Sequence, residues 1–191
     1  MSYCVRLMRV EDIPRASEID REVFPTMKIS TNFDNEFKNC LAHYIVVYED
    51  RILVTGQSEV NGDDNIIGFA GLWILVGEAH IVNIAVKPDS RRKGIGELLL
   101  MSLIELALDE NCNLITLEVR PSNDIAQKLY AKYGFTVRGI RKGYYTDNRE
   151  DAVIMTVDNM NSNPFREQFK QFKKEYYTRW GAAKIKLSAP L

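Results

Sequence analysis

The chain has 191 residues and a formal net charge of −1, with 46% hydrophobic and 27% charged residues. These values are typical of one globular domain that buries a core without disulfides or metals, so they exclude wholesale disorder and collagen-like repeats. The near-neutral balance also excludes a generally polybasic protein that binds nucleic acid through its overall charge.

The first half of the chain predicts one strand, two helices and then three strands. The expected elements are a strand at 3–9, an amphipathic helix capped by Asp12 and closed by Pro25, a helix at 33–41, and strands at 43–48, 66–76 and 79–86. Residues 55–65 are polar and acidic and contain two glycines, which predicts a long hairpin loop.

The second half alternates helices and strands. The expected elements are a strong amphipathic helix at 94–108, a strand at 114–119, a helix at 124–133 ended by Gly134, and strands at 135–137 and 152–157 around a turn at 144–148. The order βααβββαβαββ predicts a mixed α/β sheet with helices on both faces.

The C-terminal residues differ from the rest in charge. Residues 160–191 contain seven Lys/Arg and two Asp/Glu, whereas residues 1–159 are net acidic. We therefore expect an acidic domain at 1–159 and a basic extension at 160–191 that is helical over 164–180. Its aromatic residues recur at helical spacing: Phe165, Phe169, Phe172, Tyr176 and Trp180. This stripe is interpreted either as packing on the protein itself or a twin subunit, or as a helix that meets a ribosomal or other protein partner.

The three cysteines, Cys4, Cys40 and Cys112, are far apart and form no Cys-x-x-Cys pair. This spacing argues against a zinc site or a disulfide framework and fits a reducing compartment. No segment has the pattern of a signal peptide, and the longest charge-free stretch, 65–77, is too short to span a membrane. We expect a soluble, cytoplasmic protein with no membrane partner, no direct nucleic-acid partner and no metal.

A glycine-containing loop lies between the strand at 79–86 and the helix at 94–108. Its glycines, Gly94 and Gly96, leave backbone N–H groups unobstructed at a helix N-terminus, where an anionic phosphate group binds readily. Three successive cations, Arg91, Arg92 and Lys93, add positive charge at the same place. The loop therefore suits a phosphate-containing ligand.

Other interpretations of this loop are weaker. A P-loop requires Lys and then Ser or Thr after the last glycine, where this chain has Glu97. A dinucleotide fingerprint requires a third Gly or Ala where Leu99 stands, although Glu118 lies at about the offset of a ribose-binding acid. A solvated basic turn before a helix is the purely structural alternative.

The pattern Arg91-x-x-Gly94-x-Gly96 resembles the acetyl-coenzyme-A pyrophosphate loop of the GCN5-related N-acetyltransferases, the GNAT superfamily. Further segments resemble its bacterial ribosomal-protein-alanine N-acetyltransferase (RimI) branch: Asn83-Ile84-Ala85-Val86, residues 117–123, residues 129–135, Tyr144-Tyr145 and residues 150–155. The resemblance covers about residues 3–158. It implies a largely antiparallel central sheet flanked by helices, and acetyl-CoA as co-substrate without a metal. The cofactor-binding residues that it implies are Ile84, Ala85, Val86, Arg91, Arg92, Lys93, Gly94, Ile95, Gly96 and Asn123.

Glu118 is the candidate general base. It lies near the end of an otherwise apolar strand, where burial is expected to raise the pKa of a carboxylate and suit it to proton abstraction, directly or through a water. The structural alternative is an acid paired with Arg120 or with the backbone. The resemblance assigns this position to catalysis.

Tyr130 is the candidate general acid. A phenol is a weak acid that packs well in an apolar site and can protonate a departing thiolate, although most helix tyrosines are core residues. The resemblance gives Tyr130 that role, and it gives Asn123, which is also a natural helix cap, a hydrogen bond to the cofactor. It further implies that a backbone N–H in 84–86 meets the oxyanion. The two histidines, His43 and His80, receive no role, although His80 is placed where it can face the acceptor side.

The resemblance places Tyr144 and Tyr145 on the wall of the peptide groove, where exposed packing is the alternative. The chain departs from the branch at Met27-Lys28, where the branch commonly has Pro-Trp. We expect acetyl transfer to the N-terminal α-amine of a protein, with the N-terminal alanine of small-subunit ribosomal protein eighteen as the substrate that the resemblance favours. The alternatives are an acetyltransferase for lysine side chains or small amines and a catalytically silent acyl-CoA-binding module.

Overall fold

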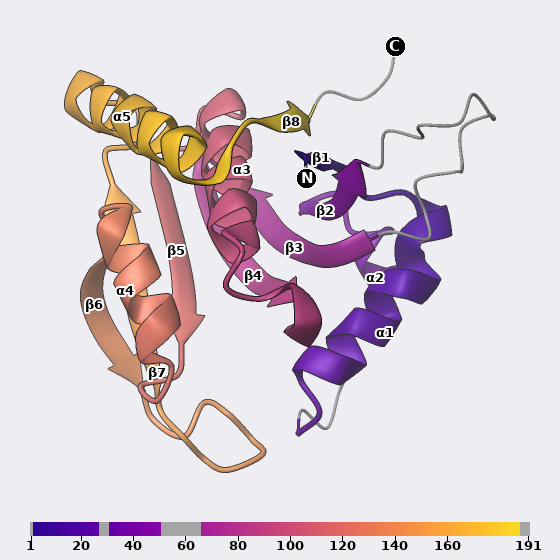
Figure 1. The fold of residues 1–191 in the computed structure, drawn as a ribbon. Coiled ribbons are helices and arrows are strands. Elements are labelled where there is room, and N and C mark those ends of the chain that lie inside the picture. The colour runs from indigo at the N-terminus through magenta and orange to yellow at the C-terminus, as the bar shows by residue number, and fades with distance from the viewer. Residues whose placement is uncertain (1, 27–30, 51–65, 188–191) are drawn as a thin grey trace, which may run out of the picture.

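The computed structural model describes residues 2–26, 31–50 and 66–187. Its strands form one eight-stranded sheet in the order β6-β7-β5-β4-β3-β2-β1-β8 (Figure 1). The strands are β1 (Ser2–Leu7), β2 (Ala42–Asp50), β3 (Ile66–Leu75), β4 (Glu78–Val86), β5 (Leu114–Val119), β6 (Thr136–Arg141), β7 (Ala152–Asp158) and β8 (Ala183–Lys186). The helices are η1 (Val10–Asp12), α1 (Ile13–Val23), α2 (Phe33–Glu36), η3 (Pro88–Ser90), α3 (Ile95–Asp109), α4 (Asp124–Lys132) and α5 (Asn163–Trp180).

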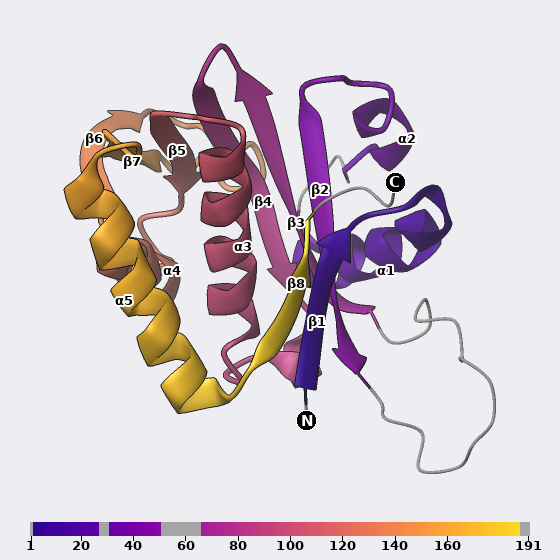
Figure 2. The ribbon, with the colours of Figure 1, turned by 90° about the horizontal axis from the view of Figure 1, so that it is seen from above.

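Helices cover both faces of the sheet, as the sequence predicted. Helices α1 and α2 lie on one face, and α3, α4 and α5 lie on the other (Figures 1 and 2). Alternation along β2 produces this division: Ile45 and Val47 belong to the cluster under α3, whereas Tyr44 and Val46 belong to the cluster under α1 and α2. The sheet therefore separates two hydrophobic cores.

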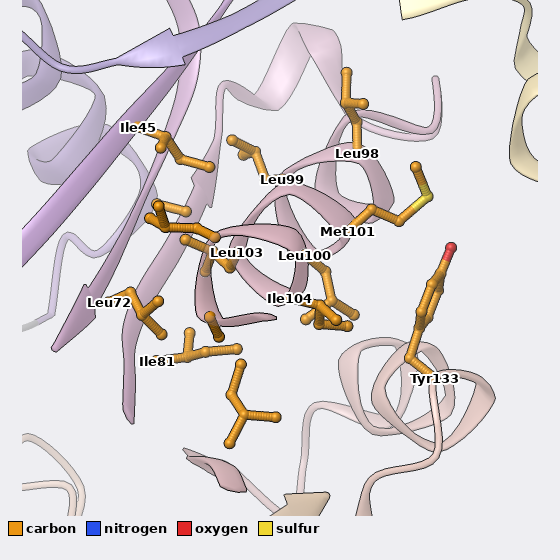
Figure 3. Packing of buried hydrophobic residues seen from close by; sticks show 14 of the residues in the cluster. Ile45, Leu72, Ile81, Leu98, Leu99, Leu100, Met101, Leu103, Ile104 and Tyr133 are labelled. Carbon is orange, nitrogen blue, oxygen red and sulfur yellow. The ribbon is translucent and has the colours of Figure 1, made fainter. Parts of the chain in front are cut away.

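Helix α3 is the centre of the larger core (Figure 3). Most of its side chains are buried, including Leu98 through Ile104, so it is apolar around nearly its whole circumference. A helix of this kind is stable only when neighbours cover it on every side. The sheet lies under it, and α4 and α5 supply the remaining cover.

Strands β4 and β5 are parallel neighbours that separate along their length. They pair only from Glu78 to Ile81 on β4, opposite Leu114 to Leu117 on β5. A register shift between Gly71 and Leu72 of β3 accompanies an unpaired Val82 on β4 just past this point. Such a bulge bends a strand, and the two strands diverge beyond it (Figure 1). The divergence opens the sheet at its middle.

Several boundaries differ from those predicted. Helix α2 spans four residues instead of nine because its apolar contact to the core is the single buried Phe33. Strand β6 extends to Arg141, beyond the predicted residue 137, because it pairs with β7 over that whole length. The predicted loop at 55–65 and the Met27-Lys28 departure lie outside the described residues.

The expected cap of the first helix is wrong in its chemistry. Asp12 does precede α1, but its buried carboxylate accepts hydrogen bonds from the Arg6 guanidinium, at 2.5 and 2.8 Å, and from the Arg9 N–H at 2.7 Å. The side chain makes no capping bond to α1. Arg6 competes successfully because a bidentate guanidinium–carboxylate pair makes two charge-assisted hydrogen bonds between full charges.

Helix α5 begins where the Asn-Pro pair predicted, and the Ser162 side chain caps it. It runs beside α3 on the face away from α1 (Figure 2). Its aromatic stripe packs on the protein's own core. Phe169 and Tyr176 are buried, and the centroid of the Phe172 ring lies 5.1 Å from that of Tyr133, at the end of α4. Strand β8, which the sequence analysis missed, follows and pairs in parallel with β1.

Of the helices that the structure describes, none combines the length and the apolar character required to cross a membrane.

Candidate active site

A pocket lies at the opening between β4 and β5. Its walls come from four parts of the chain: the end of α1 with the residues after it, the diverging strands, the start and middle of α4, and the β6–β7 turn. The lining residues are Asp20, Val23, Phe24, Pro25, Thr26, Thr31, Ile81, Val82, Asn83, Ile84, Leu117, Glu118, Val119, Arg120, Asn123, Tyr130 and Tyr145. Four residues that the sequence predicted separately, Glu118, Tyr130, Asn123 and Tyr145, thus share one pocket.

Glu118 lies between the His80 imidazole and the Arg141 guanidinium. Its side chain is only 6% exposed, its Oε2 lies 2.6 Å from His80 Nε2, and its Oε1 lies 3.2 Å from Arg141 Nη1. Glu118 and His80 are neighbours because both side chains point away from α3, on adjacent strands. The pairing with Arg120, which was the structural alternative for Glu118, is not formed, since that guanidinium binds Asp147 and Glu150.

The expected rise in the Glu118 pKa is wrong. The hydrogen bond with His80 lowers the pKa of Glu118, burial opposes this, and the charges of His80 and Arg141 lower it further, so that the net shift is downward. The carboxylate is therefore ionised at neutral pH. A carboxylate offers about four lone-pair directions, so two partners leave capacity for a third.

Tyr130 lies in α4 with its ring 5.8 Å from that of Phe135. Burial raises the pKa of its hydroxyl to about 12, so the phenol keeps its proton throughout the physiological range. The hydroxyl-bearing ring lines the same pocket as Glu118. A protonated phenol on α4 and an ionised carboxylate on β5 thus line the same pocket.

Asn123 caps α4, as the sequence predicted. Its Oδ1 accepts a hydrogen bond from the Ala126 N–H at 3.2 Å, and the residue also lines the pocket. The cap uses the oxygen only, so the amide NH₂ of Asn123 stays available on the pocket side.

Arg120 organises the turn between β6 and β7. Its guanidinium binds both carboxylate oxygens of Asp147 at 2.9 Å and Glu150 at 3.1 Å, and it stacks on the Tyr145 ring at 3.8 Å. Tyr144 packs edge-on against Tyr145 at 5.2 Å and is 42% exposed. Of the two predicted groove tyrosines, Tyr145 therefore lines the pocket directly, and Tyr144 lies outside that lining beside it.

A hydrogen bond links the two sides of the pocket mouth. Thr26 Oγ1, after α1, donates to Asp147 Oδ2 at 2.7 Å, and this bond, with the Arg120 contacts next, lowers the Asp147 pKa to about 2. The pocket is thus bordered by a bridge between segments 121 positions apart in sequence.

The glycine loop has the geometry of an anion site. Arg92 and Gly94 both have positive φ, at 61° and 78°, which turns successive N–H groups toward one side. Within the described residues, the N–H groups from Arg92 to Glu97 donate no hydrogen bond. Arg91 and Lys93 donate to the carbonyl groups of Val86 and Asp89, so they brace the loop in this structure, whereas Arg92 is exposed.

The segment of β4 at 84–86 leads from the pocket to this loop. Ile84 lines the pocket, and 84–86 pair with β3 on one side only, because the pairing with β5 ends at Ile81. One backbone edge of β4 is therefore open between the pocket and the loop. In the part of the chain that the structure describes, no group of three or more His, Cys, Asp or Glu is arranged to hold a metal ion.

Three residues that contribute to the site were not assigned by sequence reasoning. His80 and Arg141 were missed because they reach Glu118 from separate strands, and no sequence spacing shows such a contact. Arg120 was considered only as an alternative partner of Glu118, although the acid-rich turn at 147–151 offered it several other partners.

Comparison with known proteins places this geometry in context. The model of the acetyltransferase (GNAT) family matches residues 13–135. A Bacillus subtilis (strain 168) protein whose assignment as a ribosomal protein bS18-alanine N-acetyltransferase is provisional is 41% identical over 154 residues, covering 80% of this chain and 93% of its own. The Haemophilus ducreyi ribosomal protein bS18-alanine N-acetyltransferase is 36% identical over 138 residues, covering 68% of this chain and 95% of its own.

A solved structure of a protein named for the same activity has a similar fold. The ribosomal-protein-S18-alanine N-acetyltransferase from Escherichia coli superposes with a TM-score of 0.65 at 27% identity, over 82% of this chain and 94% of its own. The family match ends at residue 135, before α5 begins.

Proposed function

Since the chain belongs to the acetyltransferase (GNAT) family and is an acetyl-CoA-dependent N-acetyltransferase, we propose that its acceptor is the N-terminal alanine of ribosomal protein bS18. The observation that carries the assignment of roles is the pocket between β4 and β5, which brings Glu118 and Tyr130 together beside the open edge of β4. The relatives named for this acceptor support the choice of substrate. A ribosomal substrate also supports the proposal that the enzyme acts in the cytoplasm.

Acetyl-CoA supplies an activated acetyl thioester, and the residues present fit its parts. The N–H groups from Arg92 to Glu97 suit the pyrophosphate, with Arg91, Arg92 and Lys93 adding positive charge. The open edge at 84–86 suits the amide groups of the pantetheine arm, because a strand edge pairs with any extended chain of amides. The Asn123 amide suits a polar group near the pocket.

Glu118 has two tasks in this proposal. As an ionised carboxylate it attracts the protonated α-amine, whose ordinary pKa is about 8, and orients it in the pocket. The bound ammonium first releases one proton to solvent, because only the neutral amine has a lone pair with which to attack. Glu118 then takes a second proton from the nitrogen as the nitrogen bonds to the acetyl carbon, because a nitrogen that has given up its lone pair is strongly acidic. A low carboxylate pKa suits the first task, and the second depends on this rise in nitrogen acidity.

Tyr130 and the β4 backbone act at the other end of the reaction. The open edge of β4 offers an N–H within 84–86 to the oxygen on which negative charge develops. Tyr130 keeps its proton until the sulfur departs and then donates it, because a thiolate is a better base than water for a buried phenol. In this proposal proton removal and proton donation thus come from two elements, β5 and α4, whose side chains line one pocket.

The pocket mouth fits the end of a peptide. Tyr145 and the bridge from Thr26 to Asp147 border the entry, and Tyr144 extends the wall outward. In this proposal the small first side chain of alanine enters between Thr26 and Tyr145, and the following residues of the peptide lie along Tyr144.

Peptides test the acceptor class directly. We would incubate the enzyme and acetyl-CoA with the N-terminal peptide of bS18, with the same peptide carrying a blocked α-amine and an internal lysine, and with a small polyamine, and measure intact masses. The proposal predicts one added acetyl group on the free peptide and none on the other two. Acetylation of the blocked peptide or of the polyamine would instead assign a lysine or small-amine acetyltransferase, and no product on any acceptor would favour a silent acyl-CoA-binding module.

A further inference from the structure

The last residue of α5 lies against the first glycine of the proposed phosphate loop. A β-carbon added to Gly94 would meet three atoms of the Trp180 indole at 2.7 to 2.8 Å, closer than real side chains approach. The three atoms, Cγ, Cδ2 and Cε2, are nearly equidistant, so the α-carbon of Gly94 faces the plane of the ring. Glycine is thus required at position 94 for two reasons: its φ of 78° disfavours residues with a side chain, and the indole leaves no space for a β-carbon.

Trp180 is held from both sides along the chain. The preceding helix is anchored by the buried Phe169 and Tyr176, and by Lys173, whose Nζ lies 2.7 Å from Glu105 of α3. The following strand β8 pairs with β1. The indole therefore has a fixed support rather than a free end.

Packing, not hydrogen bonding, places the ring. Trp180 Nε1 is buried and has no hydrogen-bond partner among the described residues, while the Arg179 guanidinium lies 4.9 Å from the ring centroid. A buried N–H without a partner is unfavourable. Hydrogen bonding therefore does not explain the position of the ring, and its packing against the loop does. The flat face of the indole lies against Gly94, where no side chain of the loop stands in its way.

We propose that Trp180 is a positioning residue for acetyl-CoA: its ring holds Gly94 in the left-handed conformation that aims the N–H groups from Arg92 to Glu97 at the cofactor. This inference rests on the proposed function of the loop. Donors that are already ordered bind an anion more tightly, because binding then requires no further loss of conformational entropy in the loop. The C-terminal extension, which lies outside the family match, thus supports the cofactor site through the contact of Trp180 with Gly94.

The experiment measures coenzyme A binding by calorimetry on the full-length chain and on three variants. Trp180→Ala is expected to weaken binding about tenfold, the change given by losing about 1.4 kcal/mol of preorganisation. Trp180→Phe, which keeps a flat ring, should recover most of the affinity. Trp180→Leu fills apolar space without a flat ring, so it should preserve the fold but not the affinity.

The matched control is Phe165→Ala. Phe165 is a partly buried aromatic residue of the same helix, about 22 Å along it from Trp180 at 1.5 Å per residue, and its loss should leave coenzyme A affinity unchanged. In turnover, the Trp180 variants should raise the KM for acetyl-CoA and leave the KM for peptide and kcat at saturation near those of the unaltered enzyme.

Two failures are distinguishable. If the unaltered chain itself binds no coenzyme A, or if Gly96→Val binds it normally, the assignment of the loop is wrong. If the unaltered chain binds coenzyme A and the folded Trp180→Leu variant binds it equally well, the loop assignment stands and the role of Trp180 is overturned.

Discussion

Glu118 shows how its neighbours change the function that a residue type suggests. An acid in an apolar strand predicts a raised pKa, because burial disfavours charge. The fold brings His80 and Arg141 to its two oxygens, and these contacts outweigh burial. The identity of the candidate base was therefore predictable from the sequence, whereas its protonation state was not.

Replacing the carboxylate tests its proposed role. Glu118→Gln should lower turnover on the peptide by ~10²-fold or more at neutral pH, with partial recovery at alkaline pH, where the α-amine loses its proton to solvent. Steady-state rates across pH measure this, with the exposed Glu110→Gln as control. A Glu118→Gln enzyme with an unaltered rate at every pH would remove Glu118 from the mechanism.

His80 is expected to set the lower pH limit of activity. Its hydrogen bond is the main cause that lowers the Glu118 pKa, so His80→Gln should raise that pKa even though Arg141 remains. In the proposed mechanism the ionised carboxylate is the active form, so activity should fall as pH drops through this pKa, and a higher pKa should move the fall to higher pH. The acidic limb of the kcat/KM profile measures the shift.

The other histidine supplies the control for this experiment. His43, on β2, is part-buried and lies outside the pocket lining, so His43→Gln should leave the acidic limb in place. An acidic limb that does not move in His80→Gln would show that the pair serves only to hold the strands together.

Tyr130 is expected to act in the chemical step alone. Tyr130→Phe keeps the ring packed against Phe135 and removes only the proton, so kcat should fall ~10²-fold while the melting temperature changes little. Tyr133→Phe is the matched control, because that hydroxyl donates to Glu97 outside the pocket. Equal kcat values for the two variants would contradict the role of Tyr130.

At the scale of elements, the turn between β6 and β7 depends on one cation. Arg120, at the end of β5, binds Asp147 and Glu150 and stacks on Tyr145, which lines the pocket. Strong periodic elements such as α3 were predicted nearly to the residue. The turn at 144–148 was also predicted, but its contacts with Arg120 were not, and β8 was missed, since both depend on partners far away in the sequence.

Removing the Arg120 side chain should weaken the binding of the peptide and leave the binding of acetyl-CoA unchanged. Arg120→Ala leaves Asp147 and Glu150 close together without a counter-charge, so the turn should open and the KM for peptide should rise about tenfold while the KM for acetyl-CoA stays the same. Arg120→Lys should recover little, because an ammonium neither stacks nor binds two carboxylate oxygens at once. A change confined to the acetyl-CoA KM would contradict this assignment.

At the scale of the whole molecule, the C-terminal extension is part of the core. The spacing of its aromatic residues predicted a helix but did not determine what the stripe covers. The structure places it on α3 and α4, where Phe169 and Tyr176 are buried (Figure 2). Sequence periodicity identifies the apolar face of a helix, but its partner depends on which other surface needs cover.

Deleting the extension after Asn161 should therefore destabilise the protein. At roughly 1.5–3 kcal/mol for each large side chain that is fully buried, Phe169 and Tyr176 alone contribute about 3–6 kcal/mol of a total stability of about 5–15 kcal/mol. We expect aggregation or a large fall in melting temperature. A soluble truncated chain with unchanged melting temperature that fails only on whole-protein substrate would instead make α5 a docking arm.

The most direct test of the central claim uses the whole acceptor protein. Unacetylated small-subunit ribosomal proteins would be incubated with the enzyme and isotopically labelled acetyl-CoA, and label would be located by mass spectrometry of intact proteins and their N-terminal peptides. The account predicts label on the N-terminal alanine of bS18, absent when Glu118→Gln replaces the enzyme at neutral pH. Label on lysine side chains, or on many N-termini with bS18 unlabelled, would contradict it.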